Sequence, residues 1–240
     1  MIIINQEEMV IIMGRKKMGF ALVAILGILI SGCKAELTDF KEELTKVNET
    51  IQNKTADIFK EDYMIVTRRK EEYQNEEFIT KKDGDNYYIK ETIDYVNGSR
   101  EVSETWYIKT SENLYTVYES RKTALTYREI YATSYEVTSL DVLSDYYDGY
   151  YMAAIGMIEN DCNSTNTVCE FSKGLFGNKT MKVITTESNG SQIETITIKK
   201  GKIIGATTEV TGDLNTYEEI EFDYGNQSVK VSNKGSFKKA

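Results

Sequence analysis

The spacing of hydrophobic residues changes several times along the chain, and each spacing predicts a different element. Between residues 37 and 59 apolar side chains recur every three or four positions, as on one face of an amphipathic helix. From residue 62 the spacing becomes two, which is typical of strands with one buried face. A helical spacing returns at 139–158, and the alternation resumes at residue 180. The pattern predicts a mainly β protein of the α+β class, in which one inserted helix interrupts the strands.

The clearest strand pair covers residues 87–95 and 102–108, because Asn97-Gly98 supplies a tight turn between two alternating runs. Further strands are expected at 62–69, 74–82, 113–119, 123–132, 180–187, 192–200, 202–211 and 215–224, with a last short strand around residues 229–231. The connections are short, so consecutive strands should pair antiparallel as a meander. About ten strands in one sheet would twist and curl, which predicts a strongly curved sheet or incomplete β-barrel.

The inserted helix carries the best candidates for a binding function in the folded domain. Ser139 is a plausible N-cap, and the face that includes Leu143 and Tyr147 is apolar. Tyrosines suit amphiphilic ligands, since each presents a flat apolar ring and a polar tip. The candidate ligand-binding residues are Leu143, Tyr146, Tyr147, Tyr150 and Tyr151, together with Trp106 of the hairpin. The alternative is that this helix simply packs onto the sheet as core.

The start of the chain has the pattern of a secretory signal peptide. Arg15-Lys16-Lys17 precedes the apolar run Met18 to Ile30, which at roughly 20 Å is too short to span a bilayer core of about 30 Å. Residues 1–32 are therefore expected to be removed. Residues 1–12, which include the acidic Glu7 and Glu8, are interpreted as a start-site artefact.

The sequence Ile30-Ser31-Gly32-Cys33 resembles the bacterial lipobox. The resemblance implies that Cys33 is lipidated and becomes the first residue of a protein anchored to the cell membrane on its extracytoplasmic side. Residues 33–36 would then be a short tether, and the membrane the first partner, through lipidated Cys33.

Composition narrows the chemistry further. The net charge is −9, which argues against nucleic acid as a partner. There is no histidine, so Ser-His-Asp and Cys-His arrangements and the commonest zinc sites are excluded. Asp141, Asp145 and Asp148 lie at helical spacing, but acids on a polar helix face are normally solvated. We expect no catalytic residues, no metal site and no cofactor, and a protein that is not an enzyme.

Two cysteines remain after the lipobox, Cys162 and Cys169. Outside the membrane thiols can oxidise, and the two are close in sequence. We predict a structural disulfide rather than a redox pair, because a thioredoxin-like motif needs Cys-x-x-Cys.

The order of elements resembles the LolA and LppX/LprG-like envelope lipoprotein superfamily. The run Ile196 to Thr207 with Tyr217 to Asn226 is similar to the final hairpin of that group. The resemblance implies one domain at 37–232, followed by a disordered tail at 233–240, in which helices cover the concave face of an incomplete barrel. It implies an anchored binding protein for an acyl chain or other amphiphile. The alternative is a lipoprotein that docks another envelope protein and has a packed interior.

Overall fold

The computed structural model describes residues 38–47, 49–50, 61–112, 114–124, 128–138, 162, 164–174, 176–213, 215–232 and 234–239. The predicted signal peptide, Cys33 and the predicted helix at 139–158 lie outside these ranges. So do Leu143, Tyr146, Tyr147, Tyr150 and Tyr151. The chain divides into two compact units, residues 1–40 and 41–240, and the second contains the whole sheet.

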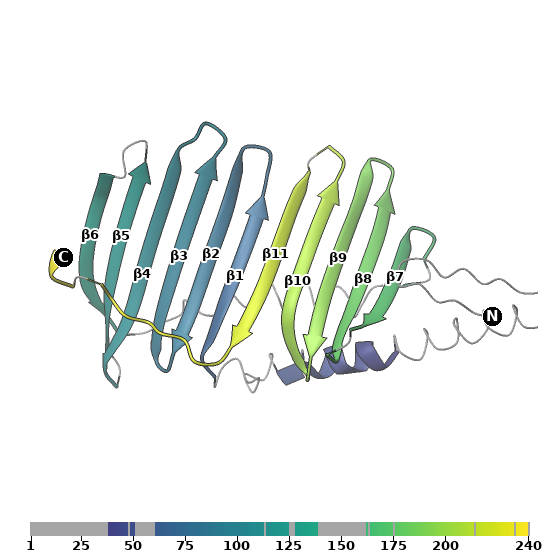
Figure 1. The fold of residues 1–240 in the computed structure, drawn as a ribbon, viewed down its shortest axis with the longest axis horizontal. Helices are drawn as coiled ribbons and strands as arrows, with labels where there is room; N and C mark the ends of the chain where they lie inside the picture. Colours follow the sequence, from purple (N-terminus) through teal and green to yellow (C-terminus); the bar gives the residue numbers. More distant parts are fainter. Residues whose placement is uncertain are drawn as a thin grey trace, which may run out of the picture. The chain divides into compact units, whose positions relative to one another are not determined.

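Twelve strands of the described residues form one sheet (Figure 1). They are β1 (Tyr63–Lys70), β2 (Gln74–Asp83), β3 (Asn86–Tyr95), β4 (Arg100–Ser111), β5 (Leu114–Ala124), β6 (Arg128–Val137), β7 (Thr167–Lys173), β8 (Asn178–Glu187), β9 (Gly190–Lys199), β10 (Lys202–Thr211), β11 (Thr216–Tyr224) and β12 (Lys238–Lys239). Their order is β12-β6-β5-β4-β3-β2-β1-β11-β10-β9-β8-β7. The sheet is therefore open and mainly antiparallel, and it is not closed into a barrel.

Two antiparallel meanders make up this order, and the pairing of β1 with β11 joins them. Tyr63 lies opposite Tyr224 and Lys70 opposite Tyr217, so the pair is in register along the whole of β1. The hairpins confirm the meander that short connections predict. In the β3–β4 turn, for example, Gly98 has a φ of 83° and the Asn97 side chain accepts a hydrogen bond from the Ser99 N–H at 2.9 Å.

The strand register divides the side chains between two faces, because neighbouring residues in a strand point to opposite sides. We call one the core face, since it carries the buried cluster of Tyr63, Ile65, Ala206 and Ile220. The apolar residues of β8 to β10 that share this face are also buried: Met181, Val183, Ile196, Ile198 and Ile203. The opposite side is called the outer face. Core burial is thus concentrated on one side of the sheet.

A helix is described over residues 38–47 and 49–50, where the sequence predicts one. Within the second unit its Leu44 and Val47 are buried, as its apolar spacing requires. Glu43 forms an ion pair with Lys179, which lies on the core face of β8 opposite Ile198. The part of the helix that belongs to the second unit is therefore held against β8 on the core face.

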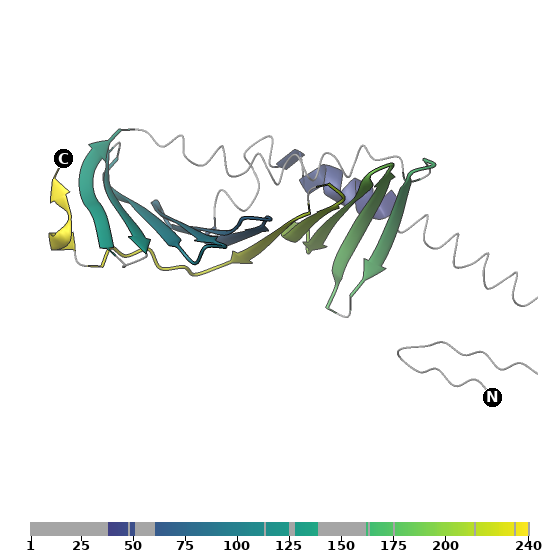
Figure 2. The same cartoon turned by 90° about the horizontal axis from the view of Figure 1, so that it is seen from above.

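Several strand boundaries differ from the predicted ones. β7 forms between residue 158 and residue 180, where no strand was expected, and β6 starts five residues later than the strand expected from residue 123. No strand forms at 229–231. The tail at 233–240, expected to be disordered, contains a 3-10 turn at Lys234–Ser236 and the short strand β12. Figure 2 shows that strand direction rotates across the sheet, as twisted strands require.

Candidate functional site

A row of aromatic side chains crosses four adjacent strands on the core face. Tyr87 of β3 lies opposite Tyr107 of β4, which lies opposite Val117 of β5, and Val117 lies opposite Tyr135 of β6. Val117 is fully buried, whereas the three tyrosines are partly exposed. The row therefore combines an apolar floor with phenol groups, which is the combination that amphiphilic ligands require.

The hydroxyl groups of Tyr87 and Tyr135 in this row have different surroundings. Burial, with the proximity of Tyr115 and Asp85, raises the pKa of Tyr87 to about 12. The Tyr135 hydroxyl donates a hydrogen bond to Glu119 Oε1 at 2.8 Å. The Tyr87 hydroxyl therefore stays protonated at neutral pH and can serve as a hydrogen-bond donor, whereas the Tyr135 hydroxyl already donates to Glu119.

A group of carboxylates lies on the same face, toward the other end of the strands. Glu76 and Glu101 both lie opposite Ile93, and Glu91 is two residues before Ile93 in β3. Burial, followed by repulsion from Glu76, raises the pKa of Glu91. Arg121 Nη2 contacts Glu101 Oε2 at 2.7 Å and balances part of the charge. The core face thus changes from apolar and phenolic to acidic along the strands.

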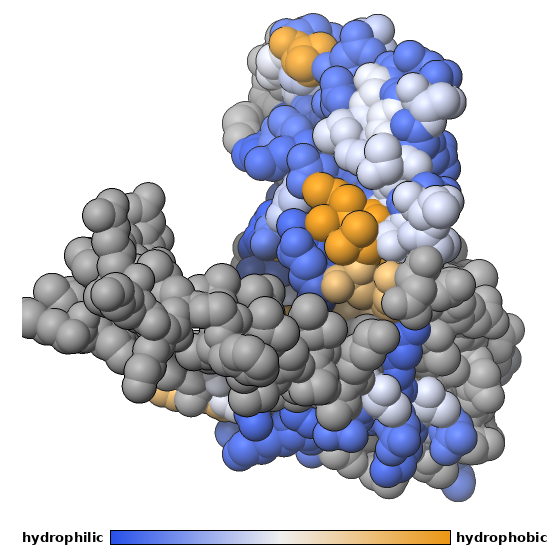
Figure 3. Space-filling model, turned by 90° about the vertical axis from the view of Figure 1, so that its right-hand side faces the viewer, coloured by the Kyte–Doolittle hydropathy of each residue, from blue (hydrophilic) through white to orange (hydrophobic). Residues whose placement is uncertain are grey.

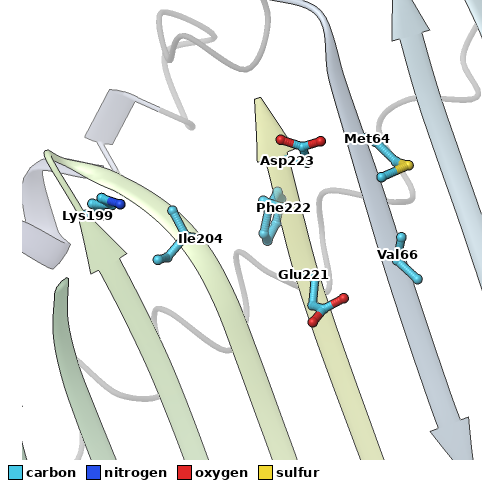
Figure 4. Close-up of a pocket in the computed structure, with 7 residues that line it drawn as sticks. All are labelled: Met64, Val66, Lys199, Ile204, Glu221, Phe222 and Asp223. Carbon is cyan, nitrogen blue, oxygen red and sulfur yellow. The ribbon is translucent and has the colours of Figure 1, made fainter. Parts of the chain in front are cut away.

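A shallow groove of about 420 Å³ lies beside β1, β10 and β11 (Figure 4). It is lined by Met64, Val66, Lys199, Ile204, Glu221, Phe222 and Asp223. The irregular pairing between Ile203 and Gly205 leaves Ile204 without a partner across the strand pair, as in a β-bulge. The bulge therefore supplies one apolar side chain of the lining.

A second hollow of about 250 Å³ adjoins the groove and shares Ile204 and Glu221 with it. Gly205 contributes to it because it has no side chain, and a Cβ there would lie 3.3 Å from the Ile220 carbonyl oxygen. The carboxylate of Glu221 is already engaged, since it accepts a hydrogen bond from Arg68 Nη1 at 2.9 Å. Both hollows lie mainly on the outer face, because Val66 and Glu221 are opposite each other and alternate with Ile65 of the core face. The described residues that line them include no nucleophile paired with a base.

Trp106, one of the predicted ligand-binding residues, lies on the outer face, on the other side of the sheet from the tyrosine row. In β4 it lies opposite Tyr88 and Tyr118, whereas its neighbour Tyr107 lies opposite Val117 on the core face. Its ring is 5.2 Å from the Tyr88 ring and 6.0 Å from the Phe237 ring, centroid to centroid. The packing contacts of Trp106 therefore come from the C-terminal residues and from its strand neighbours.

The predicted disulfide between Cys162 and Cys169 is confirmed, with the two Cα atoms 5.1 Å apart. It ties residue 162 to β7, the strand at one end of the sheet.

Figure 3, which views the molecule from the β7 side, shows small hydrophobic areas among mostly hydrophilic atoms. Val168 of β7 is 57% exposed and Phe176 of the following turn is 83% exposed.

The tyrosine row is the feature that the sequence analysis missed. Its signal was present, because Tyr87 and Tyr107 each occupy an alternating position in the hairpin that was recognised. The structure places Trp106 on the other face of β4 from this row.

Comparison with known proteins adds no family to these observations. No protein-family model matches the chain, and no curated protein proved similar to it. In the part of the chain that the structure describes, no helix is long and apolar enough to cross a membrane.

Proposed function

We propose that the protein is a lipid-anchored, extracytoplasmic binding protein that holds a hydrophobic or amphiphilic ligand, an acyl chain or lipid, against the core face of its sheet. The lipobox-like sequence ending at Cys33 supports the anchor. The open sheet and its one-sided apolar surface support the ligand, since a half-barrel of the LolA and LppX/LprG type would offer the same kind of surface.

The observation that carries the proposal is the tyrosine row of the core face, in which Tyr87, Tyr107 and Tyr135 are partly exposed around the buried Val117. Partly exposed aromatic rings beside an apolar floor offer contact area to an acyl chain.

The tyrosine row indicates the chemistry of that ligand. Tyr87, Tyr107 and Tyr135 present rings for an acyl chain, and the Tyr87 hydroxyl offers a hydrogen-bond donor for its polar end. No histidine is available to activate a nucleophile, so holding the ligand, rather than cleaving it, is the activity we propose.

A second candidate function is that of an interaction lipoprotein that docks another envelope protein while its interior is packed. The complete burial of Val117 favours it, because the middle of the tyrosine row is already shielded from solvent. The two candidates differ in whether the core face has room for a ligand.

Binding of a fluorescent fatty-acid probe tests the proposal, using the Cys33→Ser chain so that the anchor does not compete. We expect micromolar binding by this protein, loss of binding by Tyr107→Asp, and unchanged binding by the control Thr186→Asp. Thr186 is exposed on the outer face of β8, opposite Ser191. Circular dichroism would check that each variant is folded. Absence of binding by the parent chain would favour the docking function.

A further inference from the structure

The C-terminal strap, residues 225–239, leaves β11 and returns along one end of the neighbouring strands (Figure 1). The Gly225 N–H donates a hydrogen bond to the Asp62 carbonyl oxygen at 2.9 Å. Val229 is 5% exposed, and its N–H donates to Asp83 Oδ2 at 3.1 Å. The first half of the strap is therefore attached at two points close to β1 and β2.

The second half of the strap ends in an aromatic seat on the outer face, formed by Tyr88, Trp106 and Tyr118. The Phe237 ring meets Trp106 edge-on at 6.0 Å and Tyr118 edge-on at 5.2 Å. Lys234 Nζ lies 5.8 Å from the centroid of the Tyr118 ring. Phe237 thus contacts the seat through edge-on aromatic packing, and Lys234 contacts it through a cation–π interaction.

Beyond Phe237 the strap has little to hold it. β12 pairs with β6 through two residues, Lys238 opposite Thr133 and Lys239 opposite Ser134, and the pairing is parallel. Parallel pairing is the less stable kind. Residues 234–236 and 238–239 are exposed. The end of the strap therefore depends mainly on the seating of Phe237.

Charge also favours the strap as a ligand of the sheet. Residues 225–240 contain four lysines and no acidic residue, whereas the whole chain has a net charge of −9. The seat itself includes a carboxylate, because the Tyr88 hydroxyl donates a hydrogen bond to Glu104 Oε1 at 2.7 Å. A basic segment with one central aromatic residue complements this surface.

We propose that the aromatic seat is an exchangeable docking site for the strap of a second copy of this chain. In the exchanged form Phe237 of each molecule occupies the seat of the other, with the same contacts as in the closed form. Because the contacts are the same in both forms, a molecule's own strap is favoured at its seat only by the effective concentration of that strap. For a short tether this concentration is on the order of millimolar. Exchange grows as the local concentration of the protein approaches that value.

The chain contains a single tryptophan, and it is Trp106 of the seat, so tryptophan emission reports on the seat directly. The acceptor is the full chain with Phe237→Ala, whose own strap lacks the phenyl ring. The donor is the full chain with Trp106→Phe, which has no tryptophan and keeps Phe237. The control donor carries both Trp106→Phe and Phe237→Ala.

We expect the tryptophan emission of the acceptor to differ from that of the parent chain. As donor is added, the emission should return toward the parent value, and half of this change should be reached at a donor concentration on the order of 1 mM. The control donor should cause no such return. Three results would overturn the proposal: identical emission of acceptor and parent, no effect of the donor at the highest soluble concentration, or an equal effect of the control donor. If Phe237→Ala is unfolded by circular dichroism, Phe237→Leu serves as the acceptor and the same outcomes decide.

Discussion

Asp94 and Arg100 close the β3–β4 hairpin through a two-pronged ion pair. Arg100 Nε donates to Asp94 Oδ1 at 2.6 Å, and Nη2 donates to Oδ2 at 2.7 Å. The two residues are also opposite each other in the strand register. The pair therefore links the two strands directly beside the Asn97-Gly98 turn, at the point where the register of the hairpin begins.

Replacing Asp94 by Asn should destabilise the protein slightly, in a way that depends on pH. The hydrogen bonds from Arg100 hold the pKa of Asp94 below its ordinary value of 3.8. The stabilisation is thus fully present above the ordinary pKa and is lost as the pH falls through the lowered one. Since the pair is exposed, we expect a loss of about 0.2–1 kcal/mol at pH 7 and none at the acid end. Urea unfolding across this pH range measures the loss of stability, and an equal loss at every pH would contradict its assignment to the Asp94–Arg100 pair.

Glu91→Gln should have the opposite effect. Burial and the neighbouring Glu76 raise the pKa of Glu91, so the folded protein binds its proton more tightly than the unfolded chain does. Stability is then lost as the pH rises above the ordinary pKa, and the neutral amide avoids that loss. We expect a gain of at most about 1 kcal/mol at pH 7 that disappears below the ordinary carboxyl pKa. Thermal unfolding at several pH values tests this.

Glu77→Gln is the matched control for Glu91→Gln. Glu77 lies on the outer face of β2, with its Oε2 3.4 Å from Arg68 Nε. Removing its charge loses an ion pair instead of relieving repulsion. A gain of similar size from both variants would show that the effect comes from net charge alone.

Removal of the disulfide should weaken the protein without unfolding it. Cys162 and Cys169 close a loop with a sequence separation of 7. In the chain-entropy model a loop of this size is stabilised by about 2.5 kcal/mol. The double serine variant should therefore lose at most that amount in denaturant titrations. Alkylation of the parent protein without reductant should modify neither cysteine, and quantitative labelling of both would refute the bridge in solution.

Local alternation and turn residues were enough to predict most of the sheet, because each hairpin is specified within about twenty residues of sequence. The pairs β2–β3 and β3–β4 are examples, where Gly84 and Gly98 both adopt a positive φ at the turns. Non-local pairings had no such signal. The joining of β1 to β11 connects residues more than 140 apart, and Arg68 of β1 contacts Glu219 and Glu221 only after that pairing has formed.

The face assignment of β4 shows why the candidate site was harder to predict than the strands. Trp106 and Tyr107 are adjacent, so a shift of one residue moves the whole strand pattern to the other side. Both alternating sets of β4 contain apolar or aromatic residues, and the hydrophobic pattern alone does not distinguish them. The choice is made by the partners, Val117 on one face and Tyr118 with Phe237 on the other. Phe237 lies more than 100 residues away in sequence, in the tail at 233–240 that was expected to be disordered.

Gly190→Ala should be strongly destabilising, although it adds only one methyl group. Gly190 begins β9, and a Cβ there would lie 1.9 Å from the Thr211 carbonyl oxygen at the end of β10. This contact is with backbone, so a side-chain rotation does not relieve it, and the two strands must separate locally. We expect a loss of about 1–3 kcal/mol, the usual cost of forcing extra atoms into a packed site. The control is Gly235→Ala, where a Cβ would have no neighbour within 4 Å. Urea unfolding of both variants should separate them clearly, and equal stability would show that β9 and β10 approach less closely in solution.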